Sequence, residues 1–189
     1  MEIFGEDIII REAFPEEASA IRDLTVEAME FYRQNSGINK DVLESLTESV
    51  ESVKERIRRH HCLVAASAGT PLGTITVSYC DNPMKYSFSV QTGRTLSEYR
   101  DCAYISRFAV SERFRDTGLG VALMGEALRT PVVTRSGLAL LHTSVSNVKM
   151  RDFYFNRGFI LLDSEDSRGY ERGLFAYMSN QNGRDNLTA

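Results

Sequence analysis

A glycine-rich turn between a strand and a helix constrains this chain more than any other feature. The segment VSERFRDTGLGVALMGEAL (110–128) places Gly118 and Gly120 at the start of an amphipathic run, directly after the strand-like AYISRFAV. The first amides of a helix lack internal partners and lie at the positive end of its dipole. Glycines at that point let a bulky anion come close to the backbone. The segment therefore predicts a phosphate-binding turn.

Two basic residues in the same turn, Arg113 and Arg115, are candidate charges at the rim of such a site. The alternative is a turn that needs glycine for backbone geometry alone. The turn is not a P-loop, because no Lys-Ser or Lys-Thr follows Gly120.

The composition limits the partners that the chain can have. A net charge of -4 argues against a nucleic-acid binder, and no apolar run reaches the length of about 20 residues that spans a bilayer. The amino terminus MEIFGEDIII is acidic and does not read as a signal peptide. The cysteines and histidines lack the spacing of metal ligands. We therefore expect a cytoplasmic protein with reduced thiols, with no metal site, no nucleic-acid partner and no membrane partner.

Hydrophobic periodicity predicts strands and helices in the order β-α-α-β-β-β-α-β-α-β-β, an α/β mixture around one core. The expected strands are DIIIREA (7–13), HCLVAAS (61–67), LGTITVSY (72–79), AYISRFAV (103–110), LALLHTSV (138–145), FILLDS (159–164) and GLFAYMS (173–179). The expected helices are 14–34, 41–60, 118–129 and 147–158.

The pattern indicates one domain over residues 1–178, followed by a polar tail at 179–189. A polar segment, 81–100, is long for a connection inside a compact domain. It predicts either a functional insert or an additional short element.

A second motif lies in NVKMRDFYFNRGF (147–159). Asn147 suits a helix N-cap and Gly158 suits a helix end. Asn147 and Tyr154 are two helical turns apart and therefore project from nearly the same face. Two polar residues that share one face of a short helix suggest a binding role.

Taken together, AVSERFRDTGLGVALM and SVSNVKMRDFYFNRGF resemble the GNAT superfamily of acetyl-CoA-dependent N-acetyltransferases. The family's Arg/Gln-x-x-Gly-x-Gly/Ala loop is matched by Arg115, Gly118 and Gly120, and its later Asn…Tyr…Gly-Phe segment begins at Asn147. The resemblance implies a mixed, mostly antiparallel central sheet flanked by helices. In that sheet the fourth and fifth strands, here AYISRFAV and LALLHTSV, splay apart.

The same resemblance implies which residues hold acetyl-CoA, the acyl donor. Backbone groups of the fourth strand would pair with the pantetheine arm, amides of the glycine-rich turn would hold the pyrophosphate, and Asn147 would bond the arm from the other side. The residues concerned are Phe108, Ala109, Val110, Arg115, Asp116, Thr117, Gly118, Leu119, Gly120 and Asn147.

The implied chemistry is attack of a primary amine on a thioester carbonyl. The departing thiolate needs a proton, and a tyrosine pKa of about 10 lies close enough to a thiol pKa of about 8.5 for Tyr154 to donate it. A backbone N–H near Phe108 or Ala109 could stabilise the charge on the carbonyl oxygen. The alternative for Tyr154 is simple packing with Phe153 and Phe155.

The general base is left open. The fourth strand holds no glutamate, so the candidates are Tyr104, His142 and a water chain to Asp101 or to a residue on the first helices. His142 also reads as a core histidine.

Two other functions remain open at this point. ISRFAV after a long variable segment is similar to long-chain N-acyl amino acid and autoinducer synthases, although Tyr104 stands where they usually have a glutamate. The third function is a non-catalytic coenzyme A binding module, which would have no use for Tyr154.

The acceptor is a small-molecule or peptide amine that the sequence does not identify. It would enter beside the link RQNSGINKD, with Gln34, Asn35 and Ser36 as polar contacts. The oligomeric state is open too, with a homodimer through an edge formed by GLFAYMS as one arrangement.

Overall fold

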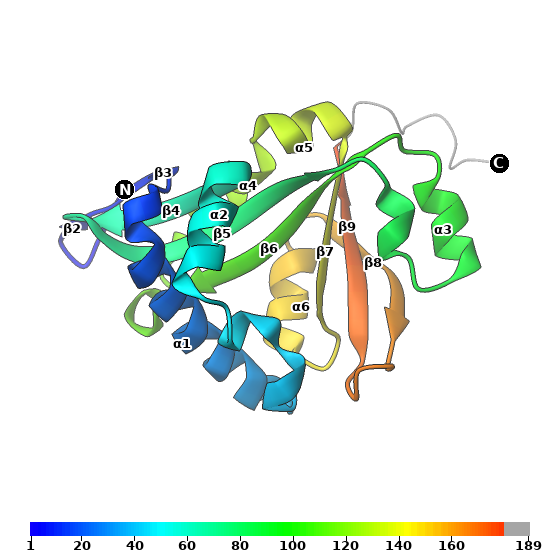
Figure 1. The fold of residues 1–189 in the computed structure, drawn as a ribbon, viewed down its shortest axis with the longest axis horizontal. Helices are drawn as coiled ribbons and strands as arrows, with labels where there is room; N and C mark the ends of the chain where they lie inside the picture. The colour runs from blue at the N-terminus through cyan, green and yellow to red at the C-terminus, as the bar shows by residue number, and fades with distance from the viewer. Residues whose placement is uncertain (180–189) are drawn as a thin grey trace. The chain divides into compact units, whose positions relative to one another are not determined.

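The computed structural model describes residues 1–179 (Figure 1). The chain divides into two compact units. Unit 1 holds residues 1–78 and 105–130, and unit 2 holds 79–104 and the described residues from 131 onward. The expected tail, 179–189, lies almost wholly outside the described residues. The single domain expected over 1–178 stays a prediction.

The strands form the mixed, mostly antiparallel sheet that the resemblance implies, in the order β3-β4-β5-β6-β7-β9-β8. Their bounds are β3 Ile9–Glu12, β4 His61–Ser67, β5 Thr70–Cys80, β6 Cys102–Val110, β7 Leu138–Ser144, β8 Phe159–Glu165 and β9 Arg172–Met178. A small hairpin of β1 (Glu2–Ile3) and β2 (Glu6–Asp7) precedes them and was not predicted. The helices are α1 Ala18–Ser36, α2 Val50–Arg59, α3 Val90–Leu96, α4 Leu119–Leu128, α5 Pro131–Ser136 and α6 Val148–Phe155.

The β4–β5 hairpin of unit 1 turns on two residues with positive φ, Ala68 at 46° and Gly69 at 82°. Positive φ at both turn positions matches the right-handed twist of the two strands. This turn joins the two strands expected at 61–67 and 72–79, and β5 begins two residues earlier than expected, at Thr70.

The helix expected over 41–60 is wrong in its first half. The chain instead makes two 3₁₀ turns, Lys40–Val42 and Glu44–Leu46, and α2 begins at Val50. The Ser49 hydroxyl accepts a hydrogen bond from the Ser52 amide at 3.1 Å, which caps the helix there. A serine that bonds the backbone in this way competes with continuation of the helix toward its amino terminus.

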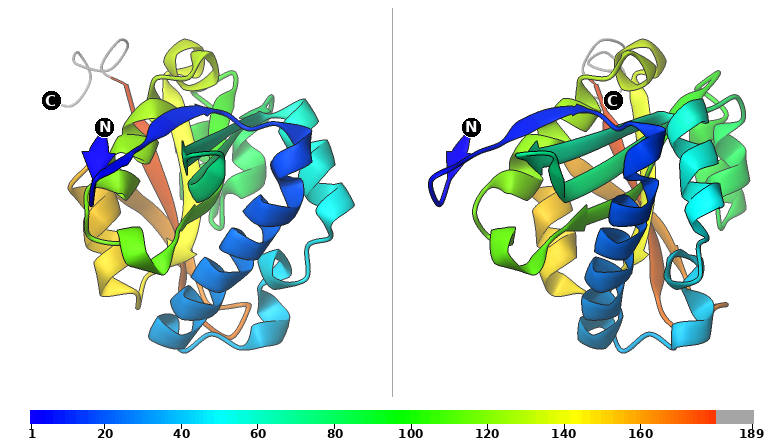
Figure 2. Two further views of the ribbon diagram at one scale, coloured as in Figure 1. Left: turned by 90° about the vertical axis from the view of Figure 1, so that its left-hand side faces the viewer. Right: turned by 60° about the vertical axis from the view of Figure 1, so that its left-hand side comes forward.

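The two long helices of unit 1, α1 and α2, lie side by side against one face of its strands (Figure 2). Their buried apolar side chains form one cluster with alternate residues of β4: Ala13, Ala18, Ile21, Val53, Ile57, Cys62 and Val64. On β5, the Cβ position of Gly73 would lie 2.7 Å from Leu123 Cδ1 of α4. Because successive strand residues face opposite sides, the sheet of unit 1 carries helices on both faces.

Unit 2 is built on the antiparallel strands β7, β9 and β8. As expected for a strand buried on both faces, β7 is almost completely buried. The first residues of β6 pair with β7 in parallel, Ala103 with Ala139 and Tyr104 with Leu140, and the pairing stops there. Such a short ladder agrees with the implied splay of these two strands.

The expectation that GLFAYMS forms a sheet edge is wrong. This segment is β9, which lies between β7 and β8, so β8 is the edge strand. A closing hairpin can add either of its strands to the sheet, and the apolar pattern does not distinguish the two placements.

The polar segment 81–100 contains a 3₁₀ turn, Pro83–Tyr86, and the short helix α3. The structure therefore shows an additional element there. Leu96 of α3 is fully buried and anchors this segment in the core of unit 2. The other buried members of that core are Cys80, Cys102, Leu138, Leu140, Leu174 and Ala176.

We expect Gly173→Ala to lower the free energy of unfolding by about 1–3 kcal/mol, as overpacked sites do. The new Cβ would meet Phe175, Leu161 and Val145 side-chain atoms at 2.7, 2.8 and 2.9 Å. Urea unfolding measures the change.

The matched control is Gly125→Ala inside α4, where a Cβ would meet only Arg129 Nη1, at 3.9 Å. This variant should be more stable than the wild type by up to about 1 kcal/mol, because alanine favours a helix over glycine. Equal unfolding midpoints for the two variants would contradict the packing described at Gly173.

Candidate active site

The predicted turn follows β6 in unit 1 and is anchored at its start. The Ser111 amide donates to the Leu72 carbonyl at 2.9 Å, and a 3₁₀ turn, Glu112–Phe114, then buries the Phe114 ring. The Thr117 hydroxyl bonds back to the Phe114 carbonyl at 2.7 Å. The loop is therefore held in one conformation up to the first residue of α4.

The amino terminus of α4 has no side-chain cap. Gly118 is its N-cap at φ 90° and has no side chain with which to cap the helix, and the first turn holds no acidic residue. By contrast, Ser49 caps α2 and Asn147 caps α6 through their side chains. Unpaired amides at a helix start form a binding site for an anion.

Space in front of Gly118 is open, since a Cβ built there meets no atom within 4 Å. The requirement for glycine at this position therefore comes from its left-handed φ rather than from crowding inside the protein. An open, unpaired helix start fits a phosphate group.

The two arginines of the turn are both occupied within unit 1. Arg115 donates from Nε to the Val110 carbonyl at 3.3 Å, approaches Glu27 at 3.6 Å and lies over the Phe31 ring at 4.0 Å. Arg113 pairs with Glu6 at 2.6 Å. In this conformation both guanidinium groups hold the loop to its surroundings.

A conformational irregularity lies in the middle of β6. Arg107 has φ 52°, a left-handed value that costs a non-glycine residue about 1–2 kcal/mol. Phe108, Ala109 and Val110 follow it directly, and Ala109 packs with Leu24 and Ala28 of α1. The family resemblance indicated Phe108, Ala109 and Val110 as contacts of the acyl donor. Nothing in the sequence indicated the left-handed conformation of Arg107.

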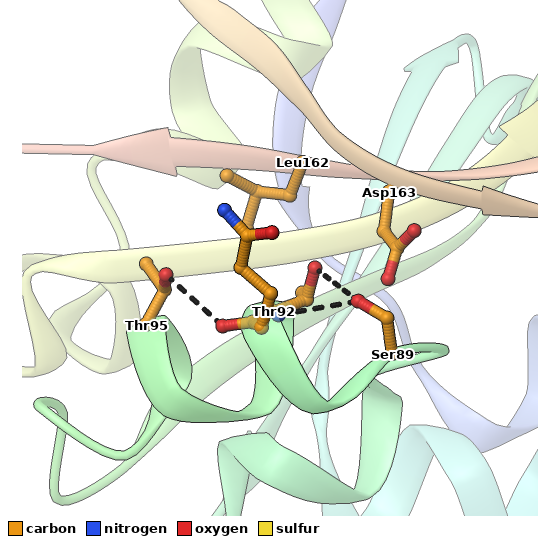
Figure 3. A pocket seen from close by; sticks show the side chains of 6 residues that line it. Ser89, Thr92, Thr95, Leu162 and Asp163 are labelled. Atoms are coloured by element: carbon orange, nitrogen blue, oxygen red, sulfur yellow. Dashed lines mark hydrogen bonds between the residues drawn. The ribbon is translucent and has the colours of Figure 1, made fainter.

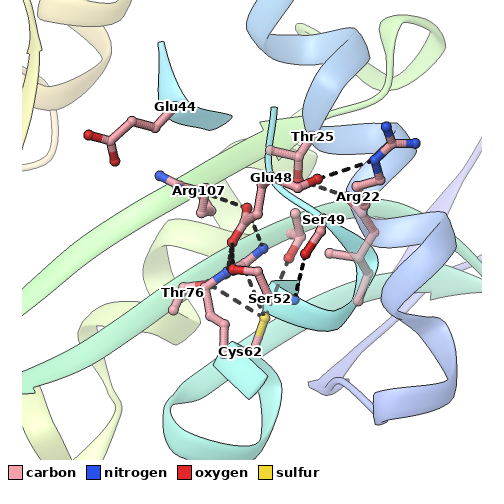
Figure 4. Close-up of polar contacts among 12 residues, drawn as sticks. Arg22, Thr25, Glu44, Glu48, Ser49, Ser52, Cys62, Thr76 and Arg107 are labelled. Carbon is pink, nitrogen blue, oxygen red and sulfur yellow. Dashed lines mark hydrogen bonds and ion pairs between the residues drawn. The ribbon is translucent and has the colours of Figure 1, made fainter. Parts of the chain in front are cut away.

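A buried charge network surrounds the Arg107 side chain (Figure 4). Arg107 Nε bonds Glu48 Oε2 at 3.0 Å, and Arg56 donates to both Glu48 oxygens at 3.2 Å. Arg56 is fixed in turn by the Thr76 hydroxyl at 2.8 Å. The Glu48 and Arg56 side chains are only 8% and 10% exposed.

Burial alone would raise the pKa of Glu48, but the hydrogen bonds and charges of Arg56 and then Arg107 hold that pKa below its ordinary value. A carboxylate held in this way is a poor proton acceptor near neutral pH. The network therefore serves structure and positioning, and nothing in the sequence around Glu48 marks it.

The second predicted motif forms α6 in unit 2. As predicted, Asn147 is the N-cap: its Oδ1 accepts a hydrogen bond from the Met150 amide at 3.1 Å. Tyr154 is 5% exposed, and its ring contacts those of Phe153, Phe159 and Phe175. Both residues are buried, as expected for two side chains on one helix face.

The two named candidates for the base, Tyr104 and His142, form a pair in unit 2. Tyr104 Oη lies 2.9 Å from His142 Nδ1, and the Tyr86 ring stacks on Tyr104 at 4.3 Å. Burial, with a smaller contribution from the charge of Arg172, lowers the pKa of His142 to about 3. His142 is therefore neutral near pH 7 and holds a proton weakly, which favours its interpretation as a core histidine.

Unit 2 also contains a polar pocket of about 210 Å³ (Figure 3). Ser89, Gln91, Thr92 and Thr95 line it from α3 and its N-cap, and Leu162 and Asp163 line it from β8. Sequence analysis missed this pocket, because nothing in the sequence places 81–100 beside the edge strand.

Two kinds of feature are absent from residues 1–179. Within that range, no three His, Cys, Asp or Glu side chains are grouped as metal ligands. None of its helices combines the length and apolarity needed to cross a bilayer.

The model of the acetyltransferase (GNAT) family matches residues 21–159. The chain belongs to the GNAT acetyltransferase family, whose acyl donor is acetyl-CoA. The unpaired amides and open space at Gly118 fit the phosphates of that donor. No curated protein matches the chain.

Solved structures with this fold include PaiA N-acetyltransferase from Thermoplasma acidophilum in complex with coenzyme A. It is 18% identical, with a TM-score of 0.66, over 91% of this chain and 99% of the other. A GNAT acetyltransferase from Streptococcus agalactiae is 17% identical, with a TM-score of 0.71, over 92% and 96% of the chains. Ard1 from Thermoplasma volcanium is 22% identical, with a TM-score of 0.60, over 91% and 97%. These likenesses show the fold.

We expect Gly118→Ala to weaken coenzyme A binding, because alanine disfavours the φ of 90° that opens the helix start. Isothermal titration calorimetry measures the affinity. Gly69→Ala is the control, since Gly69 has φ 82° in the β4–β5 turn and open space around its Cβ position. It should lose similar stability and keep its affinity. Equal affinities for the two variants would contradict the anion site.

We also expect the stability conferred by Glu48 to depend on pH. Because its pKa is lowered on folding, this stability is present above about pH 4.3, the unfolded value, and is lost as pH falls through the folded value. The difference in unfolding free energy between wild type and Glu48→Gln should therefore shrink between pH 7 and pH 3. A constant difference would show that the carboxylate charge is not what stabilises the fold.

Proposed function

We propose that this protein transfers the acetyl group of acetyl-CoA to a primary amine. The observation that carries the proposal is the uncapped amino terminus of α4, with Gly118 in a left-handed conformation at its first position. Family membership supports acetyl transfer in general, and the identity of the amine is open.

The amides from Asp116 to Gly120 are proposed to hold the pyrophosphate, whereas the Arg115 amide, expected to join them, donates to the Glu112 carbonyl at 3.2 Å. Backbone groups of Phe108, Ala109 and Val110 are proposed to pair with the pantetheine arm. Support comes from the short β6–β7 ladder, which stops at Tyr104 and leaves the later part of β6 outside that pairing. The proposed role of Asn147 rests on the family motif, and its cap to Met150 fixes the position of its amide group.

Bound acetyl-CoA supplies a thioester whose carbonyl carbon an amine can attack. The attacking amine must be neutral, and its nitrogen must lose a proton as the amide bond forms and the carbon–sulfur bond breaks. We propose that Tyr154 gives its hydroxyl proton to the leaving sulfur. Support for this role comes from the place of Tyr154 in the family motif, two helical turns after Asn147, and from its ring contacts with Phe153, Phe159 and Phe175, which fix the side chain.

The low pKa of His142 argues against that residue as the base. A water chain to Asp101, which is half-buried just before β6, fits the proposal better. The acceptor is proposed to be a cationic small-molecule or peptide amine, in keeping with the net charge of -4.

A cytoplasmic location and the absence of nucleic-acid and membrane partners remain part of this proposal. The three buried cysteines are free, which agrees with a reducing compartment. The homodimer also remains a proposal, now with β8 as the sheet edge that it would use.

The function is tested by incubating the purified protein with acetyl-CoA and a panel of amines and measuring the release of free thiol. Mass spectrometry then identifies the acetylated amine. A parallel arm with long-chain acyl-CoA tests the long-chain acyl alternative, which is excluded if this arm releases no thiol. Coenzyme A binding without thiol release in any arm would leave a binding module instead of an enzyme.

We expect Tyr154→Phe to lower kcat at least tenfold while coenzyme A binding is retained, because only the proton donor is removed. The control is Tyr177→Phe, whose ring also packs against Phe159, at 5.6 Å. This control should keep wild-type kcat. An unchanged kcat in Tyr154→Phe would remove this residue from the mechanism and leave it a packing role.

A further inference from the structure

Arg107 lies inside strand β6 and has a left-handed backbone conformation, which residues other than glycine usually avoid. Its φ of 52° directly precedes Phe108, Ala109 and Val110. A change of backbone at Arg107 would re-aim the amide and carbonyl groups of the residues after it. Something outside the local sequence must hold this conformation.

The contact that holds it comes from the link between α1 and α2. Glu48 lies just before the N-cap of α2 and bonds Arg107 Nε through Oε2 at 3.0 Å. Glu48 is itself immobilised by Arg56, and Arg56 by Thr76 of β5. The carboxylate is therefore a fixed point, and Arg107 is tied to it.

We propose that Glu48 is a positioning residue for the acyl donor: through Arg107 it holds the backbone of Phe108–Val110 in the geometry that binds pantetheine. This inference rests on the proposed function, because it takes β6 as the strand that binds the donor. Glu48 touches neither the donor nor the amine in this role.

The network also separates this role from acid–base catalysis. A general base must accept a proton, whereas two arginines stabilise Glu48 in its charged form. Loss of a base would lower kcat alone. Loss of a positioning residue should appear in the dissociation constant of coenzyme A, measured without any acceptor or turnover.

The test uses the full chain and isothermal titration calorimetry with coenzyme A. Glu48→Gln should raise the dissociation constant about five- to tenfold. This factor is the one expected if Arg107 leaves its strained conformation and coenzyme A must restore it on binding. Arg107→Gly should bind within about twofold of wild type, because glycine adopts a positive φ without strain. In the Arg107→Gly background, adding Glu48→Gln should not change the dissociation constant further, because a glycine at position 107 adopts the positive φ without a restraining contact.

Arg107→Ala is the second probe, and it keeps the Glu48–Arg56 pair intact if Glu48→Gln fails to fold. It loses the same contact as Arg107→Gly but keeps a Cβ, so it should bind coenzyme A about five- to tenfold more weakly than the glycine variant. Glu17→Gln is the matched control. It breaks a two-bond ion pair with Arg11 elsewhere in unit 1 and should leave the affinity unchanged.

The outcomes are distinct. If the wild type binds coenzyme A and Glu48→Gln binds equally well, the positioning role is overturned and the proposed function stands. Equal affinities for Arg107→Ala and Arg107→Gly, or the same loss from Glu48→Gln in the Arg107→Gly background, would also overturn it. A wild type that does not bind coenzyme A overturns the proposed function and this inference with it.

Discussion

The backbone between Arg107 and Gly118 is the constraint on which the proposed site depends. A protein that binds a ligand through main-chain groups must leave those groups unpaired and yet hold them still. Here the parallel pairing of β6 stops at Tyr104, and α4 starts without a side-chain cap. The positive φ values at Arg107, Asp116 and Gly118 then aim the backbone of this segment. Unpaired amides and left-handed residues are each unfavourable in a fold, so their concentration in one segment indicates a functional reason.

The restraint on this segment comes from side chains that take no part in the proposed chemistry. Phe114 anchors the turn by burial, and Arg115 ties it to α1 through Glu27 and Phe31. Glu48 ties the strand to the link before α2. The family motif gives Arg115 a role toward the pyrophosphate. In this structure its guanidinium stabilises the loop, which is a contribution that the motif alone does not indicate.

Much of the fold could be predicted from the sequence, because hydrophobic periodicity and the residues that form turns and helix caps carry most of the information. The strands β4, β5, β6 and β7 were expected close to where they lie, and Asn147 was expected as a cap. The start of α2 was missed because Ser49 lies inside an apolar pattern that continues across it. The place of β9 in the sheet was missed because it is set by long-range pairing, which no local pattern records.

The site was less predictable than the fold for a related reason. A glycine, as at position 118, indicates that a left-handed backbone conformation is possible. An arginine, as at position 107, gives no such indication. Glu48 lies 59 residues from its partner, and its neighbours TESVES read as part of the helix expected over 41–60. Tertiary contacts override local preference at both positions. The pKa of His142 is likewise a result of burial in the fold, which the isolated residue does not reveal.

The edge strand β8 has a consequence for self-association. Its ladder with β9 slips between Leu161 and Asp163, so Leu162 is an extra residue in the strand. Bulged, charged edges resist the addition of further strands and so protect a protein from fibril growth. A second copy joining this edge would find two short regular stretches, Phe159–Leu161 and Asp163–Glu165, separated by the bulge at Leu162. The bulge therefore limits how far an added strand can pair with β8.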